Sequence, residues 1–318
     1  MLDPNNFELF LKNPGELISI LKAFPPDLEW IIIDEIQKIP ALLDVVHQQI
    51  ESTKRKFILT GSSSRKLKRG GANLLAGRAF IFELFPLTHL ELDVKFDLVK
   101  TLQWGSLPRI WHESITDLDR ELFLKAYTQS YLKEEIQEEQ LVRNLKSFYS
   151  FLEIAAQMNG KILNYTKIAK DLGVDSKTVQ KYFDILEETH ISYRLEPFHQ
   201  SLRKRQREHQ KFYFFDIGVQ RSLLKVAKFP VVKGTYEYGN IFEHFIILEI
   251  IRLNSYFQKD CSFSYLQTHH NLEIDLVIER PRQPTILCEI RSTQNIDKSD
   301  LSSMLSIKKD FPEFQYYC

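Results

Sequence analysis

Two short apolar runs near the N-terminus each end in polar residues. Residues 30–33 are Trp-Ile-Ile-Ile, and Asp34 and Glu35 follow them directly. A second apolar run at residues 56–59 leads into the Thr-Gly-Ser of residues 60–62. Because continuous apolar runs of this length are typical of strands covered on both faces, we expect two buried strands of a parallel sheet. Ligands of such sheets lie at the carboxyl ends of the strands, where these polar side chains stand.

Helical spacing of apolar residues surrounds these two runs. It predicts a helix over residues 7–24 that is interrupted at Pro14-Gly15, and a second helix over residues 40–50 that Pro40 opens. Residues 79–84 are apolar enough to predict a third strand. Strands and helices in this order are the signature of an α/β domain.

The middle of the chain has a different pattern. The elements that we expect there are a helical stretch over 117–158, helices over 165–172 and 176–188, and strands over 191–198 and 212–215. Gly173 marks a tight turn between the two short helices, which gives helix-turn-helix spacing. A basic loop at residues 203–207 lies between the two strands. Together these elements predict a winged helix.

The last third of the chain predicts a second α/β unit. We expect an apolar helix over residues 241–253, followed by strands over 263–267, 274–278 and 285–290.

Composition adds few constraints on function. The chain has 318 residues, and its 42 basic and 42 acidic side chains cancel, so net charge predicts no partner. The three cysteines are far apart and form no Cys-x-x-Cys pair, for which a reducing cytoplasm is the expected location. No apolar run approaches the ~20 residues needed to cross a bilayer, and the first residues do not resemble a signal peptide. We therefore expect a cytoplasmic protein with no membrane contact.

Several motifs in a fixed order resemble a large bacterial and archaeal family of AAA-type ATPases. The matching segments are a Walker B block at 30–40, a sensor strand at 57–63, the segments at 75–78 and 85–88, a Gly-Ser-Leu-Pro block at 105–108, and a Lys-Phe-Tyr-Phe-Phe-Asp-Ile-Gly block at 211–218. The resemblance covers nearly the whole chain. It implies a partial P-loop NTPase core with a parallel sheet over 1–116, a helical linker and winged helix over 117–232, and a restriction-endonuclease-like, PD-(D/E)XK-like α/β domain over 233–318.

The sequence departs from that family pattern at two functional motifs. A Walker A loop requires Gly-x-x-x-x-Gly-Lys and then Ser or Thr, but the only Gly-Lys pair, at 160–161, is followed by Ile162. We expect the phosphate loop to lie upstream of Met1, so that the sheet lacks a central strand and the N-terminal domain is destabilised or dependent on a partner. The nuclease-like signature reads Glu289-Ile290-Arg291 instead of Glu-x-Lys.

The resemblance assigns roles in ATP hydrolysis to the residues at the first two strand ends. Asp34 would order Mg²⁺, and Glu35 would polarise the attacking water. Thr60 or Ser62 would sense the γ-phosphate, and Arg78 would either face phosphate or form a structural ion pair. ATP and Mg²⁺ are the implied cofactors, and without a phosphate loop in the sequence we expect impaired binding and hydrolysis.

The second helix of the predicted winged helix carries polar residues that could contact DNA. The candidates on this helix and in the following loop are Ser176, Lys177, Gln180, Lys181, Arg203 and Arg205. Four acidic residues in and beside this helix, Asp175, Asp184, Glu187 and Glu188, would repel a phosphate backbone, and many winged helices dock proteins instead of DNA. Both kinds of partner stay open.

Carboxylates at the ends of two predicted strands suggest a metal site in the last third. Asp275 and Glu289, with Glu243 on the preceding helix, could share a divalent ion that activates water against a phosphodiester. Arg291 keeps the positive charge of the family lysine but cannot give up a proton. An inherited fold without catalysis is the alternative.

Three functions follow from these observations. The first is an AAA-type ATPase whose activity is impaired in this chain, with an upstream polypeptide or another protein completing its core. The second is a Mg²⁺-dependent nuclease that uses Asp275 and Glu289, and the third is a non-enzymatic protein that binds DNA or another protein.

Overall fold

The computed structural model describes residues 4–25, 27–61, 79–132, 145–199, 209–268, 272–293 and 302–318. The chain is a mixed α/β protein that divides into two compact units, Met1–Ile81 and Phe82–Cys318, called here the N-terminal and the C-terminal unit. Four predicted site residues, Ser62, Arg78, Arg203 and Arg205, lie outside the described residues.

The N-terminal unit follows the predicted order of elements. It contains α1 (Pro4–Lys12), α2 (Glu16–Ala23), β1 (Trp30–Ile33), η1 (Ile36–Lys38), α3 (Leu42–Ser52) and β2 (Lys56–Leu59). The break at Pro14-Gly15 separates α1 from α2, as expected from the inability of a helix to continue through proline without losing a hydrogen bond. Strands β1 and β2 are parallel, with Trp30 opposite Lys56 and Ile33 opposite Leu59.

Only one face of β1 is covered in the described part of this unit. Ile31 and Ile33 pack into a core with residues of α2 and α3, whereas Trp30 and Ile32 are 53% and 67% exposed. The expectation that this strand is buried on both faces is therefore wrong. The apolar run was long enough for a buried strand, but the described helices supply a layer on one side alone.

The predicted third strand at residues 79–84 is also wrong. The segment forms no strand, and Phe80 and Ile81 are both 89% exposed. A strand requires a neighbour for its backbone N–H and C=O groups. Of the described residues, those of β1 and β2 alone make up the sheet of the N-terminal unit.

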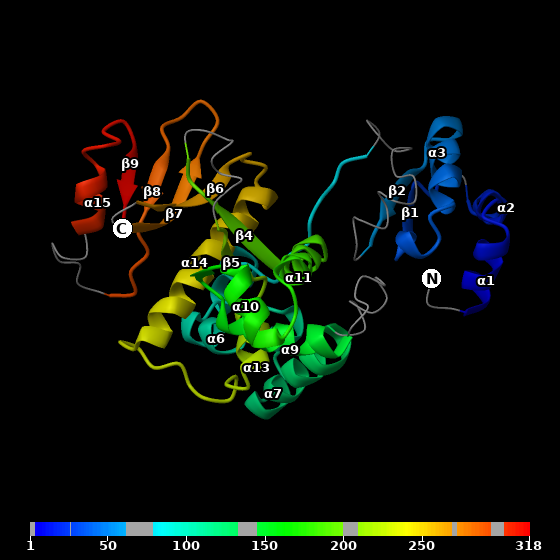
Figure 1. The fold of residues 1–318 in the computed structure, drawn as a ribbon. Coiled ribbons are helices and arrows are strands. Elements are labelled where there is room, and N and C mark those ends of the chain that lie inside the picture. The colour runs from blue at the N-terminus through cyan, green and yellow to red at the C-terminus, as the bar shows by residue number, and fades with distance from the viewer. Residues whose placement is uncertain are drawn as a thin grey trace. The chain divides into compact units, whose positions relative to one another are not determined.

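The C-terminal unit begins with helices and ends in a sheet with helical cover (Figure 1). Its first helical elements are α5 (His89–Leu92), η3 (Asp93–Lys95), α6 (Leu98–Trp104), η4 (Pro108–Trp111), α7 (Asp117–Ala126) and the π-helical turn η5 (Tyr127–Tyr131). Next come α9 (Leu145–Gln157), β3 (Lys161–Ile162), α10 (Tyr165–Leu172), α11 (Ser176–Glu188), β4 (Ser192–Pro197) and β5 (Lys211–Phe214). The remainder is α13 (Ile217–Leu223), α14 (Tyr236–Tyr256), β6 (Ser262–Gln267), β7 (Glu273–Glu279), β8 (Ile286–Cys288), α15 (Ser302–Ile307) and β9 (Gln315–Tyr317).

One seven-stranded sheet runs through most of this unit. Its strand order is β3-β5-β4-β6-β7-β8-β9. The pairs β4–β6 and β8–β9 are parallel, and the other neighbours are antiparallel. Strand β4 joins the two halves, because it pairs with β5 through residues 192–195 and with β6 through residues 196–197.

Helices cover the sheet of β6, β7 and β8 on both faces. On one face, Ile247 of α14 belongs to a cluster with Leu276 of β7. On the other, Met304 and Ile307 of α15 pack against Leu287 of β8. Figure 1 shows α14 (yellow) and α15 (red) in this arrangement. This three-layer packing explains why β7 is apolar at most positions, and why a charged residue on it needs partners.

The helix-turn-helix spacing predicted from the sequence is confirmed. Helix α10 ends at Gly173, whose φ of 66° lies in the left-handed region, and α11 begins after Asp175. The Asp175 carboxylate accepts a hydrogen bond from the backbone N–H of Thr178 at 2.9 Å, which caps α11. Among the described helices, none combines the length and the apolar character that a membrane span requires.

Candidate functional site

The ends of β1 and β2 are tied together by the residues predicted to handle nucleotide. The Thr60 hydroxyl donates a hydrogen bond to Oδ1 of Asp34. The backbone N–H of Glu35 donates to Oγ1 of Thr60 at 3.4 Å, and the N–H of Ile36 donates to the Thr60 carbonyl oxygen at 3.0 Å. The structure therefore brings together three of the five predicted catalytic residues, Asp34, Glu35 and Thr60, and the other two lie outside the described part.

A side chain that the sequence did not single out orients Glu35. The amide of Gln37 donates a hydrogen bond to Oε2 of Glu35, and Gln37 is only 4% exposed. Glu35 has a φ of 56°, so the chain turns sharply where the strand ends. Gly61 makes room for Gln37, because a Cβ at position 61 would lie 2.5 Å from its Oε1. The close packing around Gln37 therefore restricts the Glu35 carboxylate that it binds.

This strand end could hold a hydrated cation but contains no phosphate-binding loop. Asp34 is exposed, and carboxylate oxygens are ligands that Mg²⁺ accepts. A mostly apolar pocket of about 210 Å³ lies between α1, α2 and β1, and Asp34 borders it together with Asn6 and Phe10. That volume is below the roughly 300 Å³ at which small-molecule sites begin. The pocket is therefore no substitute for a complete nucleotide site.

Four of the six residues predicted for DNA contact lie on the surface of α11, and the other two, Arg203 and Arg205, lie outside the described residues. Ser176, Lys177, Gln180 and Lys181 are all exposed. Lys167 and Lys170 of the neighbouring helix α10 are exposed as well. This surface therefore carries several cations in the described residues.

Two acidic residues of α11 should repel a phosphate backbone less than the sequence implied, because both are paired with an arginine. Arg194 of β4 lies 2.9 Å from Asp184 and also pairs with Glu187. The side chain of Arg194 is 8% exposed, whereas those of Asp184 and Glu187 are 42% and 41% exposed, so the two ion pairs are only partly shielded from water. A residue on a strand thus pairs with two of the acidic residues of α11, which no pattern along the helix could show.

Asp275 and Glu289 meet at adjacent strands of the sheet, as predicted. The Asp275 carboxylate accepts a hydrogen bond from the backbone N–H of Ile290 at 2.7 Å. Arg291 pairs with Glu289 and lies 3.6 Å from Oδ2 of Asp275. Burial, and then the charge of a neighbouring carboxylate, raises the pKa of both acids: Glu243 acts on Asp275, and Asp275 acts on Glu289. Both carboxyl groups are therefore harder to ionise here than in water.

A second cation beside these acids is Lys211, which Sequence analysis did not assign to the site. Its Nζ lies 3.0 Å from Oε1 of Glu243, 2.6 Å from Oε1 of Glu273 and 3.9 Å from Oδ1 of Asp275. In the described part of the chain, no three His, Cys, Asp or Glu side chains lie close enough together to hold a metal ion. The lysine of the block at 211–218 was the available signal, but its partners are 30 or more residues away in sequence.

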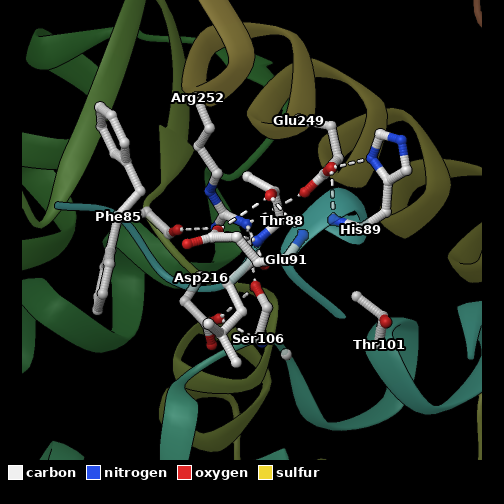
Figure 2. A network of polar contacts seen from close by, with 12 residues as sticks. Phe85, Thr88, His89, Glu91, Thr101, Ser106, Asp216, Glu249 and Arg252 are labelled. Carbon is white, nitrogen blue, oxygen red and sulfur yellow. Dashed lines mark hydrogen bonds and ion pairs between the residues drawn. The ribbon is translucent and has the colours of Figure 1, made fainter. Parts of the chain in front are cut away.

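A second buried network explains three motifs that carried the family resemblance (Figure 2). Arg252 of α14 is 1% exposed and donates to Oγ of Ser106 at 2.9 Å and to the Phe215 carbonyl at 2.8 Å. Glu249, one turn earlier, accepts from the backbone N–H of His89 at 3.0 Å and contacts its Nδ1 at 2.6 Å. The network thus joins the segments around residues 88, 106 and 215 to one helix.

Asp216 belongs to the same network through its hydrogen bond with Ser106. It is fully buried, and its carboxylate accepts from the N–H of Ser106 at 2.7 Å and from that of Val219 at 3.0 Å, where it caps α13. Burial raises the pKa of this carboxyl group. A Cβ on Gly105 would lie 2.2 Å from Oδ1 of Asp216, and one on Gly218 would lie 2.0 Å from the Trp104 carbonyl oxygen. These motifs are therefore explained by packing and hydrogen bonding inside the C-terminal unit.

Comparison with known proteins assigns each part of the chain to a family profile. Residues 2–92 match an AAA domain, residues 95–229 match a domain of unknown function (DUF8612), and residues 238–317 match a second domain of unknown function (DUF4143). Residues 2–92 thus form an AAA domain by this match. The AAA-type resemblance that the order of motifs predicted is thereby confirmed.

Relatives of this AAA-type chain occur in bacteria and archaea. An uncharacterized protein of Mycobacterium tuberculosis is 24% identical over 282 residues, which cover 87% of this chain and 62% of the relative. One from Haemophilus influenzae is 23% identical over 273 residues, covering 78% and 65%, and one from Methanocaldococcus jannaschii is 24% identical over 300 residues, covering 87% and 64%. The AAA-type chain thus spans less than two thirds of the length of these relatives. No solved structure matches it significantly.

Proposed function

We propose that the N-terminal unit forms the metal and water side of an ATP site in an AAA-type ATPase. The observation that carries this proposal is the hydrogen bond from the Thr60 hydroxyl to Asp34, which joins the ends of two parallel strands inside the matched AAA domain. Asp34 would hold hydrated Mg²⁺, and Glu35, oriented by Gln37, would polarise the attacking water. The Thr60 hydroxyl would respond to the γ-phosphate.

The phosphates themselves would be bound by a loop that this sequence does not contain, supplied by an upstream segment or by another polypeptide. Two features support this part of the proposal. The AAA-type relatives are longer than the aligned region, and the apolar side chains of Trp30 and Ile32 lack a covering layer in the described residues. A strand and helix that carry a phosphate loop would supply both the missing cover and the backbone N–H groups that bind phosphate.

ATP hydrolysis by an extended chain tests this proposal. The chain alone should show no turnover, and the chain extended by the translated upstream reading frame should hydrolyse ATP with Mg²⁺. Glu35→Gln in the extended protein should lower kcat by about 100-fold or more while ATP binding persists, because the carboxylate acts on the water in the transition state.

Asp44→Asn, at an exposed position of α3, provides the matched acidic control and should leave kcat unchanged. Equal turnover by the Glu35→Gln and Asp44→Asn proteins would remove Glu35 from the mechanism.

A second function is favoured by the neutralised acids of α11, and we propose that α10 and α11 form the helix-turn-helix of a winged helix that binds duplex DNA. Helix α9, strand β3, helices α10 and α11 and strands β4 and β5 follow one another in winged-helix order, with β3, β5 and β4 adjacent in the sheet. Because Arg194 pairs with Asp184 and Glu187, the exposed lysines are left to meet phosphates.

The salt dependence of DNA binding tests this second function. In Lys177→Gln/Lys181→Gln, the slope of log affinity against log salt, measured by fluorescence anisotropy with a labelled duplex, should fall by about 2. The control pair Lys308→Gln/Lys309→Gln changes two exposed lysines elsewhere and should keep the original slope. Identical slopes for the two variants would instead favour protein docking by this surface.

A further inference from the structure

We propose that the C-terminal unit carries a site for single-stranded nucleic acid, formed by a pocket between α7, η5, α9 and α13 and by the loop at residues 225–236 beside it. The pocket would take one nucleotide, and the loop would hold the neighbouring one. The site shares no residue with the proposed ATP site or with the duplex-binding surface of α11, so it stands apart from both.

The pocket has the size and the mixed lining of a ligand site. Its volume is about 540 Å³, within the roughly 300–1,000 Å³ typical of such sites. Helices α7 and α9 both contact α13 beside it (Figure 1). Leu152 and Leu223 contribute apolar wall, and Tyr149 contributes an aromatic ring. A nucleotide base, which has an apolar face and polar edges, suits a wall of this kind.

Two hydroxyl groups line the pocket where the helical backbone widens. Residues Tyr127–Tyr131 form a π-helical turn, a feature frequent at functional sites. Within this turn, the Thr128 hydroxyl donates to the Leu124 carbonyl oxygen at 3.0 Å and lies 3.2 Å from Oγ of Ser222. Because Thr128 has used its single hydrogen, Ser222 donates to Thr128 and keeps its lone pairs for an N–H group of a base.

Lysines give the pocket its affinity for phosphate. Lys125, Lys225 and Lys228 line it, together with Glu121 and Glu153. Two of these lysines are paired, Lys125 with Glu121 at 2.9 Å and Lys225 with Glu153 at 2.8 Å. Both pairs are partly open to water, where ion pairs are weak, so phosphate can compete for these lysines. Exposed Lys228 supplies the remaining positive charge of the wall.

The loop beside the pocket is held in place although it exposes an aromatic ring. The Gln103 amide donates to the carbonyl oxygens of Ala227 at 2.5 Å and Phe229 at 2.9 Å, and it accepts from the N–H of Val231 at 2.8 Å. Arg221, which is 1% exposed, donates to the Phe229 carbonyl at 2.6 Å. The Phe229 side chain is nevertheless 55% exposed. An exposed ring on an ordered backbone is a stacking surface that needs little further ordering on binding.

The combination of aromatic and cationic groups favours a single strand over other partners. Nζ of Lys228 lies 5.3 Å from the centre of the Phe229 ring, and exposed Lys233 continues the loop beyond the pocket. Glu237 is the only acid among residues 225–237, and it is paired with buried Arg221. A second copy of this chain would place lysines against lysines. A single strand supplies phosphates for the lysines and unpaired bases for the ring and the pocket.

Fluorescence anisotropy with labelled oligo-dT of about 16 nucleotides tests the inference, with oligo-U of the same length as a second probe. Phe229→Ala should weaken binding by about 5- to 100-fold, because the stacking of one base is lost. Phe257→Ala removes a ring of matching exposure, 57%, at the end of α14 and should bind like the wild type. Tighter binding of oligo-dT than of oligo-U would identify DNA as the strand, and the reverse would identify RNA.

The salt dependence of oligo-dT binding reports the phosphate contacts. In Lys228→Gln/Lys233→Gln, the slope of log affinity against log salt should fall by about 1.4, since each phosphate contact of a single strand contributes about 0.7. Lys308→Gln/Lys309→Gln should keep the original slope.

Lys177→Gln/Lys181→Gln separates this site from the proposed duplex-binding surface. It should bind oligo-dT like the wild type, so a failure of duplex binding by α11 would leave the present proposal standing. An oligo-dT affinity that falls as far in this variant as in Phe229→Ala would overturn the proposal, and so would a wild type that binds neither oligonucleotide. Equal affinities of Phe229→Ala and Phe257→Ala would also overturn it and would favour an acidic protein as the partner of the loop.

Discussion

Replacing Arg252 with methionine should lower the free energy of unfolding of the C-terminal unit by about 3–5 kcal/mol. Arg252 is 1% exposed, and its guanidinium donates hydrogen bonds to Ser106, Phe215 and Glu249. Methionine fills a similar volume but removes the donor to the Phe215 carbonyl oxygen and the counter-charge of the buried Glu249 carboxylate. The size of the loss comes from these unpaired groups more than from the lost contacts. Urea unfolding followed by circular dichroism measures it.

Arg252→Lys distinguishes charge from geometry at this position. Lysine keeps the positive charge but cannot present the planar set of donors that reaches several acceptors. We expect the free energy of unfolding of Arg252→Lys to lie between that of the wild type and that of Arg252→Met. Lys259→Met, an exposed cation on the same unit, should change the unfolding midpoint little. A loss in Arg252→Met no larger than that in Lys259→Met would show that the network contributes nothing to stability.

Gly105→Ala should lower the unfolding free energy of the same unit by about 3 kcal/mol or more. Gly105 has a φ of 78°, and an added Cβ would lie 2.2 Å from Oδ1 of Asp216 and 2.6 Å from the backbone nitrogen of Gly218. The methyl group would therefore displace the carboxylate that Ser106 and Val219 require. The same urea experiment gives the change in midpoint.

Gly173→Ala separates backbone strain from steric conflict. Gly173 has a similar φ of 66°, but nothing lies within 4 Å of an added Cβ. Gly173→Ala should lower the free energy of unfolding by only about 1 kcal/mol, which is the penalty of the left-handed conformation alone. If the two alanine variants lose the same stability, the predicted clash at Gly105 does not determine the need for glycine there.

The sequence alone located most of the elements, because their signals are local. The helix-turn-helix at 165–188 follows from apolar spacing, Gly173 and a capping Asp175, all within one short stretch. The ends of β1 and β2 were placed by the polar residues that stop two apolar runs. The order of motifs also gave the AAA-type family, which the family profiles confirm.

The predictions that were wrong concerned the burial of a strand face and the pairing of a strand. Both depend on other parts of the chain. An apolar run at 30–33 does not reveal that Trp30 and Ile32 lack a covering helix in the described residues. The segment at 79–84 pairs with none of the strands in the described part of the chain. Neither property is encoded in the residues of the strand itself.

Local order along the chain was thus determined by the sequence, since capping, turn formation and helical spacing act over a few residues. The tertiary structure alone decided which charges meet. It placed Lys211 in ion pairs with acids of α14 and β7, and Arg194 in ion pairs with acids of α11. It also brought Arg252 into contact with three separate motifs. These partners lie up to 165 positions apart, and burial makes their pairing obligatory, because a desolvated charge is tolerated only beside its counter-charge or hydrogen-bond partners.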